Sequence, residues 1–455
     1  MSNNTALDTI KVGLIFLGRK RPGFDPQWGE EVAGRVRKFV AETEFDTCEP
    51  SVKVIDDTTL IAAVEECKQK HVDVIVTLQT TMADMRMAPT FSQHWSNPIV
   101  LWTTPENQES DTVSSCSLVG NHAWASTLWQ MRHPFEMVYG DPTDARTRQQ
   151  YIEAVQLAHT YKQIHTARLG IIGSQAPGFF GMASDLFSSS RGMGVQVQNY
   201  TLVEYADIVN SFGEKEIAAD IAKVKALGIP HKDTTDEDLP MASCMYMAFR
   251  HFMDAEAVDA LSFRCWPEMP NMFGQWPYLA MARLSGEDRS IACEGDVDGA
   301  LTALAGKYLG MGPCQLSDWL EHDDETITLW HTGTAPLCLA PAPGEPGGPQ
   351  IARHFNNNKP AVVESTLKAD MPITICRLWH SDSQYMITAC DSQTVIPRRH
   401  LRGTNGLARL DDRNPREWFD SLCHHGMPHH VSVFAGHHTG LLRRFARMMQ
   451  MQWVD

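Results

Sequence analysis

VGLIFLG, from Val12 to Gly18, is a run of apolar side chains that stops at a glycine. It predicts a strand that is buried on both faces. Further strands are predicted at 51–57, 72–80 and 98–104, with helices between them at 26–41 and 58–70. Apolar strands that alternate with helices indicate an open parallel α/β sheet with right-handed crossovers, of the Rossmann-like kind.

The same alternation returns further along the chain and then gives way to a different pattern. Strands are predicted at 168–174, 195–201, 260–266, 289–296 and 326–333, and helices at 145–164, 214–227, 242–256 and 298–310. A segment rich in Pro and Gly follows at 339–350, and short alternating stretches come after it at 361–367, 373–380 and 384–391, before a last helix at 440–449. We therefore predict two α/β domains, 1–165 and 166–345, and a smaller β-rich, barrel-like domain, 346–455.

Composition excludes several classes of protein. Among 455 residues, Asp and Glu outnumber Lys and Arg by 55 to 39, and a net charge of -16 argues against binding nucleic acid by bulk charge. No apolar run approaches the roughly 18 to 20 residues that span a bilayer, so no membrane association is expected. The polar start lacks the features of a signal peptide, and the 11 scattered cysteines form no Cys-x-x-Cys pair. These features predict a protein of the reducing cytoplasm, without a disulfide framework.

A basic cluster follows the first strand. Arg19, Lys20 and Arg21 lie where the chain leaves the predicted sheet and enters a helix, whose N-terminus adds positive potential. One interpretation is an anion-binding loop for a sugar phosphate, sulfonate or carboxylate. A solvated basic turn is the commoner explanation of such a run, and position alone leaves both open.

Acidic residues follow two later strands, at the edge where ligands bind in open α/β sheets. FRCWPEMP places Glu268 just beyond one strand, and IACEGDVDG places Glu294 and Asp296 at the end of the next. Singly, each acid is more often a helix cap or a surface residue, and Asp296 is well placed to cap the following helix. Together, carboxylates in one cleft repel each other, and a divalent cation such as Mg²⁺ or Mn²⁺ is the usual remedy.

Histidines provide further candidate ligands. His331 ends the strand of LWHTGTAP, where a lone histidine is more often structural. GMPHHVSVFAGHH holds the pairs His429–His430 and His437–His438, and neighbours on a strand point to opposite faces, so at most one of each pair faces a given site. One imidazole added to two carboxylates completes a set typical of Mn²⁺.

Together these motifs resemble the L-fucose/L-arabinose isomerase superfamily. The resemblance rests on the Trp-Pro-Glu loop, the Cys-Glu-Gly-Asp-Val-x-Gly-Ala segment, the Trp-His-x-Gly-x-Ala-Pro segment and the late His-His pair. It implies a ketol isomerase that needs Mn²⁺, with Mg²⁺ or Co²⁺ as alternatives, and that moves a proton between C2 and C1 through a cis-enediol. Glu268 and Asp296 become the implied metal ligands and acid/base catalysts, with His430 or His429 as third ligand. Glu294 is the rival to Asp296.

The basic cluster suggests a substrate with an anionic group far from its reacting end. Within the family this resembles the sulfoquinovose isomerase subgroup, which converts 6-deoxy-6-sulfoglucose to 6-deoxy-6-sulfofructose. The implied enzyme is a cytoplasmic homo-oligomer: a trimer, tetramer or hexamer. The expected substrate contacts are Arg19, Arg21, Trp266, Gln275, His331 and His429. A neutral deoxyhexose or pentose as substrate, a metal-dependent aldolase or epimerase, and a non-catalytic sugar-binding protein are the alternatives left open.

Overall fold

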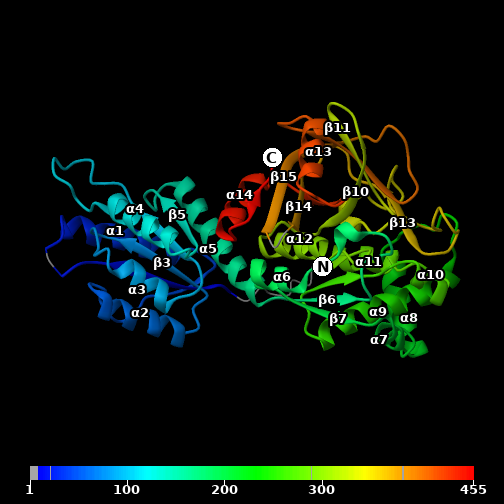
Figure 1. The fold of residues 1–455 in the computed structure, drawn as a ribbon, viewed down its shortest axis with the longest axis horizontal. Coiled ribbons are helices and arrows are strands. Elements are labelled where there is room, and N and C mark those ends of the chain that lie inside the picture. The colour runs from blue at the N-terminus through cyan, green and yellow to red at the C-terminus, as the bar shows by residue number, and fades with distance from the viewer. Residues whose placement is uncertain (1–8, 21, 288, 382–383) are drawn as a thin grey trace. The chain divides into compact units, whose positions relative to one another are not determined.

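A computed structural model describes residues 9–20, 22–287, 289–381 and 384–455. The chain divides into two compact units (Figure 1). The first comprises Met1–Gln163 with Arg447–Met449, and the second comprises Ile164–Ala446 with Gln450–Asp455. The domain boundaries predicted at 165 and 345 stay predictions, and each unit is described by itself.

The first unit contains a five-stranded parallel sheet in the order β2-β1-β3-β4-β5. Its strands are β1 (Lys11–Leu17), β2 (Asp46–Cys48), β3 (Val74–Gln79), β4 (Ile99–Thr103) and β5 (Phe135–Tyr139). Its helices are α1 (Pro26–Val40), α2 (Asp57–Gln69), α3 (Met87–His94), α4 (Ser117–Gln130) and α5 (Ala145–Thr166), the last of which ends in the second unit. Every residue of β3 and β4 is buried, as expected of strands covered on both faces.

One predicted strand of this unit is wrong. At 51–57 the structure has only an isolated bridge between Leu17 and Val54, and the edge strand is the short β2 instead. The reason is local, because the side chain of Asp56 accepts a hydrogen bond from the Thr59 amide (2.9 Å) and caps α2. The capping carboxylate turns the chain into a helix before a strand can extend.

The second unit begins with a four-stranded parallel sheet in the order β7-β6-β8-β9. Its strands are β6 (Arg168–Ile172), β7 (Gln196–Tyr200), β8 (Ala260–Phe263) and β9 (Ser290–Ala292). The helices are α6 (Leu186–Met193), α7 (Leu202–Val209), α8 (Glu214–Ala226), α9 (Leu239–Ala255), α10 (Glu268–Met272), α11 (Tyr278–Gly286) and α12 (Val297–Tyr308), with 3₁₀ turns η1 (Phe180–Met182) and η2 (Asp236–Asp238). The predicted parallel α/β architecture is confirmed in both sheets.

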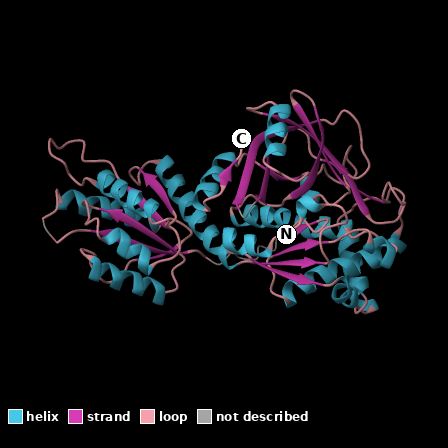
Figure 2. Ribbon diagram, in the orientation of Figure 1, coloured by secondary structure: helices cyan, strands magenta, loops and turns pink. Residues whose placement is uncertain are grey.

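The second unit also holds a closed antiparallel barrel of six strands (Figure 2). Around the barrel the order is β16-β11-β10-β17-β14-β15, and the pairing of β15 with β16 closes it. These strands are β10 (Gln315–His322), β11 (Thr326–His331), β14 (Pro372–Ser381), β15 (Gln384–Val395), β16 (Thr404–Leu410) and β17 (His430–Ala435). Additional elements are β12 (Gln350–Ala352), β13 (Val362–Thr366), β18 (Gln452–Trp453), η3 (Leu337–Leu339), α13 (Pro415–His424) and α14 (Thr439–Met448).

The predicted C-terminal β-rich barrel is therefore confirmed, with one correction. The strand predicted at 326–333 was assigned to the second parallel sheet, but β11 pairs with β10 and β16 inside the barrel. Its alternating burial is that of a barrel strand with one face inward, which a short apolar run does not distinguish from a parallel strand. Within the described residues, none of the helices is long and apolar enough to cross a membrane.

Helix α12 joins the second sheet to the barrel. Its residues from Val297 to Gly306 are all buried, and the backbone amide of Leu378 in β14 donates to Thr302 Oγ1 (3.2 Å). Gly306 lies so close to the Phe434 ring of β17 that a Cβ atom at this position would stand 2.3 Å from it. Helix α12, which follows β9, is thereby packed against β14 and β17 of the barrel.

Candidate active site

Two acids and three histidines come together between the second sheet and the barrel. Glu294 follows β9, Asp318 lies in β10, His331 ends β11, and His429 and His430 stand at the start of β17. Three overlapping groups of potential metal ligands have all their donor atoms within 4.8 Å of one another: Cys293, Glu294 and His331; Glu294, His429 and His430; Asp318, His331 and His430. Residues from four strands thus converge on one small volume.

Glu294 sits in a left-handed turn immediately after β9, with φ of 64°. Its side chain is largely buried, and the indole Nε1–H of Trp266 donates to its Oε1 (2.9 Å). Its other oxygen, Oε2, lies 3.3 Å from His430 Nε2 and 3.7 Å from His429 Nε2. Burial alone would raise the pKa of Glu294, but the imidazoles of His429 and His430 outweigh it and hold that pKa below its usual range.

The two ring nitrogens of His430 have different surroundings. Its Nδ1 lies 2.8 Å from Asp296 Oδ2, while Nε2 is buried and makes no hydrogen bond to any described residue. That Nε2 faces the carboxylate oxygens of Glu294 (3.3 Å) and Asp318 (3.6 Å). Burial lowers the pKa of His430, but Asp296 and Glu294 outweigh it and raise this pKa to about 9.

Asp318 and His331 complete the cluster from two neighbouring barrel strands. Asp318 is directly opposite His430 in the pairing of β10 with β17, so their side chains share a face. His331 is buried, its ring centre is 5.4 Å from that of His430, and its Nδ1 lies 3.1 Å from Thr332 Oγ1. Burial lowers the pKa of His331, so this imidazole is held neutral.

The donor set fits a divalent cation. Imidazole nitrogens with carboxylate oxygens suit Mn²⁺ and similar ions. His430 Nε2 is buried and makes no hydrogen bond to a described residue, and the two carboxylates that lie 3.3 Å and 3.6 Å from it supply the negative charge that a cation needs. Asp318, His331 and His430 form one group of donors that could hold a metal, and Glu294 belongs to the other two groups, which it shares with His430 or His331.

Asp296, a predicted ligand and catalyst, has a different environment. It is fully buried, and both its oxygens contact the Arg377 guanidinium at 2.6 Å. It also accepts from the Gly299 amide as the N-cap of α12 (2.9 Å) and contacts His430 Nδ1. Burial would raise the pKa of Asp296, but the charge of Arg377 outweighs it and holds that pKa far below its usual range. This arrangement argues against direct contact between Asp296 and a metal.

Glu268, the other predicted ligand, begins α10 and pairs with a cation. Its Oε1 lies 2.6 Å from Arg264 Nη2, and its Oε2 accepts from Arg264 Nε (2.8 Å). Arg264 also donates to Ser174 Oγ (2.8 Å). Among the residues that the structure describes, Glu268 belongs to none of the three donor groups. Asp318 does belong to one of these groups, with His331 and His430, and the role of Glu268 as a ligand stays a prediction.

A pocket of about 510 Å³ opens onto the cluster. Its walls are mostly aromatic and imidazole side chains, and its lining comprises Phe179, Trp266, Trp276, Tyr278, Glu294, Asp318, Trp319, Leu320, Trp330, His331, Thr332, His354, Phe355, Asn356 and His429. The volume suits a monosaccharide, and flat aromatic faces suit a sugar ring. Within this lining of described residues there is neither Lys nor Arg.

Some of the predicted substrate-binding residues line this pocket and others do not. Trp266, His331 and His429 line the pocket, whereas Gln275 is buried outside its lining as far as the structure describes it. Arg19 belongs to the first unit, where its guanidinium lies 5.8 Å from the Phe24 ring centre. Arg21 lies outside the described residues.

A disulfide joins the two strand ends that carry the site, contrary to the prediction from cysteine spacing. Cys265 and Cys293 are bonded, with Cα atoms 6.0 Å apart, and they directly precede Trp266 and Glu294. The prediction failed because the two cysteines are 28 residues apart in sequence and meet only when β8 and β9 pair. The covalent link fixes the spacing of the two segments.

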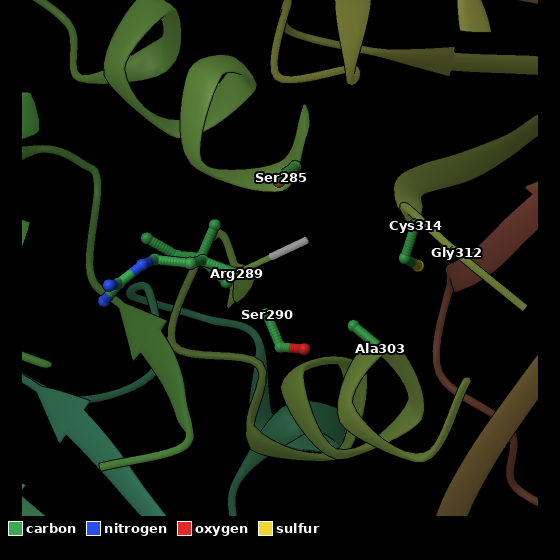
Figure 3. Close-up of a pocket in the computed structure, with 7 residues that line it drawn as sticks. Ser285, Arg289, Ser290, Ala303, Gly312 and Cys314 are labelled. Carbon is green, nitrogen blue, oxygen red and sulfur yellow. The ribbon is translucent and has the colours of Figure 1, made fainter. Parts of the chain in front are cut away.

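A second hollow, shown in Figure 3, is not a substrate site. Its lining comprises Ser285, Arg289, Ser290, Ile291, Ala303, Gly312 and Cys314. Its volume of about 10 Å³ leaves room for about one water molecule. Arg289 turns its guanidinium away from Cys314 and pairs with Asp254 (2.9 Å).

Fold and site together define an α/β protein with a closed barrel and a carboxylate–imidazole cluster at the base of an aromatic pocket. No protein-family model matches the chain. It is similar to the sulfoquinovose isomerase of Priestia aryabhattai, with 23% identity over 88% of this chain and 90% of that one. The enzyme of that name from Clostridium sp. (strain MSTE9) is 26% identical over 83% and 85% of the two chains, and that from Alkalicoccus urumqiensis is 23% identical over 84% and 86%. These similarities indicate an isomerase.

The matches to solved structures are weak. A periplasmic solute-binding protein of an ABC transporter from Actinobacillus succinogenes, solved with bound D-allose, is 11% identical with a TM-score of 0.19. The match covers 66% of this chain and 90% of that protein's chain. A TM-score this low does not bear on the alternative of a sugar-binding protein.

Proposed function

We propose that the chain is a metal-dependent aldose–ketose isomerase that converts sulfoquinovose (6-deoxy-6-sulfoglucose) to 6-deoxy-6-sulfofructose. The observation that carries the proposal is the cluster of Glu294, Asp318, His331 and His430 at the base of a monosaccharide-sized pocket. The sulfoquinovose isomerases that match most of the chain support the choice of substrate.

In this proposal Glu294, Asp318, His331 and His430 hold Mn²⁺, with Mg²⁺ or Co²⁺ as alternatives. The unpaired Nε2 of His430 and the two carboxylates beside it support this ligand set. A bound cation of this kind supplies Lewis-acid polarisation of substrate oxygens. Asp296 and Glu268, the ligands expected from the sequence, keep partners of their own in Arg377 and Arg264.

Glu294 and Asp318 are the groups that we propose for proton transfer. The open-chain aldose loses the proton on C2 to one carboxylate, and the electron pair of that bond forms the C1=C2 bond of a cis-enediol while the C1=O π pair moves to O1, which takes a proton from the second carboxyl group. O2 then gives its proton to that second carboxylate as the C2 carbonyl forms, and C1 receives the proton held by the first carboxyl group. Such positioned acid–base steps contribute about 10²- to 10⁴-fold in rate.

The pocket walls orient the sugar in the same proposal. Trp266 is fixed by its hydrogen bond to Glu294 and lies against Phe179, with ring centres 5.6 Å apart. His429 is partly exposed beside the cluster and is placed to donate to a substrate hydroxyl. Flat side chains on several sides would also exclude water from the reacting carbons.

The sulfonate needs a cation that the pocket lining does not supply within the described residues. We therefore assign it to the basic cluster around Arg19, contributed by a second copy of the chain in a homo-oligomer. Arg19 is half-buried, and its guanidinium lies over the Phe24 ring while Lys20 pairs with Asp56 (2.6 Å), so within the described residues Arg19 is the cation that we assign to the sulfonate. The predicted cytoplasmic location stays a prediction.

An isomerase of a neutral deoxyhexose or pentose is the second candidate. The observation that favours it is the largely aromatic pocket lining, which within the described residues holds no Lys or Arg to pair with an acidic substituent. The ratio of kcat/KM for sulfoquinovose and for L-fucose or L-arabinose decides between the two.

The decisive experiment incubates the purified protein with sulfoquinovose, with and without Mn²⁺ and after dialysis against EDTA. We expect 6-deoxy-6-sulfofructose by NMR, loss of turnover with EDTA, recovery with Mn²⁺, and deuterium at C1 when the solvent is D₂O. Sugar binding without turnover under all conditions would instead indicate a sugar-binding protein. Deuterium at C2 of an epimeric aldose, or cleavage into two shorter products, would indicate an epimerase or an aldolase.

A further inference from the structure

Three fully buried side chains form a continuous line beneath the candidate site. Arg377 comes from β14, Asp296 from the start of α12 and His430 from β17. Arg377 Nη1 and Nη2 each lie 2.6 Å from an oxygen of Asp296, and Asp296 Oδ2 lies 2.8 Å from His430 Nδ1. Asp296, at the start of the helix that follows the second sheet, therefore connects two residues of the barrel, Arg377 and His430.

The carboxylate of Asp296 is fully occupied within this line. Its Oδ1 accepts from the Gly299 amide and Arg377 Nη2, and its Oδ2 accepts from Arg377 Nη1 and His430 Nδ1. A carboxylate oxygen accepts about two hydrogen bonds, so neither oxygen has an acceptor position left. Among the residues of the candidate site, His430 is the one that Asp296 contacts directly.

We infer that Arg377 and Asp296 are positioning residues that hold His430 with Nε2 directed at Glu294 and Asp318. An ionised carboxylate can only accept, so Nδ1 of His430 carries the hydrogen and Nε2 is the nitrogen left to bind. The two-pronged contact of Arg377 fixes the plane of the Asp296 carboxylate, and with it the orientation of the imidazole. The inference rests on the proposed function, because it assigns this line a role in binding the metal.

The packing around the pair leaves it little freedom. A Cβ atom added at Gly299 would stand 2.4 Å from Asp296 Oδ2 and 3.0 Å from Arg377 Nη1, so the helix backbone presses directly on the pair. Burying two charges costs free energy of desolvation, and a buried ion pair adds little to stability compared with apolar side chains of the same size. The pair offsets this cost by fixing the orientation of His430.

The test measures Mn²⁺ affinity directly, by electron paramagnetic resonance titration of the purified, metal-depleted full chain. We expect Arg377→Met and Asp296→Asn to weaken Mn²⁺ binding by about 10- to 100-fold, the usual effect of removing a group that orients a metal ligand. Arg377→Lys keeps the charge but not the two-pronged contact, so it should restore Mn²⁺ affinity only in part. Gly299→Ala removes no charge and should weaken binding by displacing the Asp296 carboxylate.

A second buried pair in the same unit provides the matched control. Arg283 contacts both oxygens of Asp220 at 2.8 Å and 2.9 Å, and both side chains are buried. Arg283→Met and Asp220→Asn should lower thermal stability as much as the corresponding changes at Arg377 and Asp296, and should leave Mn²⁺ affinity unchanged. An equal loss of Mn²⁺ affinity in the control variants would overturn the inference, because it would reflect general destabilisation.

The outcomes separate the inference from the proposed function. If the unaltered chain neither binds Mn²⁺ nor isomerises sugar, the proposed function fails and the inference falls with it. If the unaltered chain binds Mn²⁺ and folded Asp296→Asn and Gly299→Ala bind it equally well, only the positioning role is overturned. These two variants suffice should Arg377→Met fail to fold.

Discussion

Asp318 and His430 stand directly opposite each other on β10 and β17, with Asp318 Oδ1 3.6 Å from His430 Nε2. Opposite residues of an antiparallel pair point to the same face, so the barrel itself brings an acid and an imidazole together. Glu294 joins them from the second sheet, with Oε2 3.3 Å from the same Nε2. The site is therefore formed by two sheets that come together, and neither of them contains it alone.

The first prediction concerns Asp318. We expect Asp318→Asn to lower kcat by at least about 100-fold, because a proton-transfer group and a metal ligand are lost together. Mn²⁺ content after gel filtration should fall as well. Glu321→Gln on the same strand is the control, since Glu321 is exposed and pairs with Arg399 at 2.9 Å. Normal turnover by Asp318→Asn would remove Asp318 from the site.

The second prediction compares Glu294 with Glu268. Glu294→Gln should abolish isomerisation and Mn²⁺ retention, because Glu294 faces His430 within the cluster. Glu268→Gln should keep full Mn²⁺ content and lose at most about 10-fold in kcat/KM, since its partner is Arg264 rather than the cluster. Metal analysis and initial rates of the two variants check this. The reverse result would restore the assignment made from the sequence.

The fold was predictable from the sequence where the signal was local. The apolar runs ahead of Gly18 and Gly173 predicted β1 and β6 correctly, because a strand covered on both faces is largely apolar. The strand expected at 51–57 is absent because Asp56 caps α2, so the chain enters a helix where the strand was expected to end. Barrel membership of β11 is set by non-local pairing with β10 and β16, which a single strand does not reveal.

The candidate site was predictable in part. His331, His429, His430 and Glu294 were named from their positions at strand ends, and the structure groups them. Asp318 was not predicted as a site residue. It lies within LSDWLE, where the alternating pattern suggests that an acidic side chain faces solvent. Its position beside His430 depends on the register of β10 with β17, which is set by the closed barrel.

A third prediction concerns the acid stability of the first unit. Burial lowers the pKa of His133 to about 4, well under the value near 6.5 of an unfolded histidine. The folded form therefore takes up this proton at a lower pH than the unfolded form does. The stability that the neutral imidazole contributes is complete above pH 6.5 and is lost as the pH falls towards 4. About 3 kcal/mol of unfolding free energy should disappear across this window.

Urea unfolding at pH 7.5 and pH 4.5 tests the contribution of His133. His133→Gln does not titrate, so its stability should fall less between the two pH values than that of the unaltered chain. His122→Gln is the control, because His122 is exposed on α4 and its replacement should leave the pH dependence as it was. The same loss of stability in His133→Gln and the unaltered chain would contradict the prediction.

A fourth prediction concerns the Cys265–Cys293 bond. Alkylation of the protein unfolded without reductant should modify nine cysteines, and alkylation after reduction should modify all 11. Opening a link between residues 28 apart should cost about 3.5 kcal/mol of unfolding free energy by the chain-entropy account. Thermal unfolding with and without dithiothreitol measures this cost, with the Cys265→Ser, Cys293→Ser double variant as the control that no longer responds. Eleven modified cysteines without reductant would show that the bond is absent in solution.

The last prediction concerns Arg19 and a site shared between copies. Arg19→Ala should raise KM for sulfoquinovose by about 10-fold or more, since a charge-assisted hydrogen bond contributes about 1.5 to 3 kcal/mol. KM for a neutral sugar should hardly change, and Lys38→Ala, which alters another cation of this unit at the end of α1, should affect neither. Equal effects of Arg19→Ala on both sugars would make the basic cluster a structural turn.

Subunit mixing then decides whether Arg19 acts across copies. Arg19→Ala and Glu294→Gln chains carrying different tags are co-expressed, and the mixed oligomer is purified through both tags. If Arg19 of one copy serves the cluster of another, some sites in the mixed oligomer contain neither change, and activity at low sulfoquinovose should exceed that of either variant alone. If both residues act within one copy, every site keeps one defect and the mixed oligomer should be no more active than the Arg19→Ala protein. A monomeric protein with full activity would also exclude sharing, because the Arg19 guanidinium would then reach the sulfonate, if at all, within a single chain.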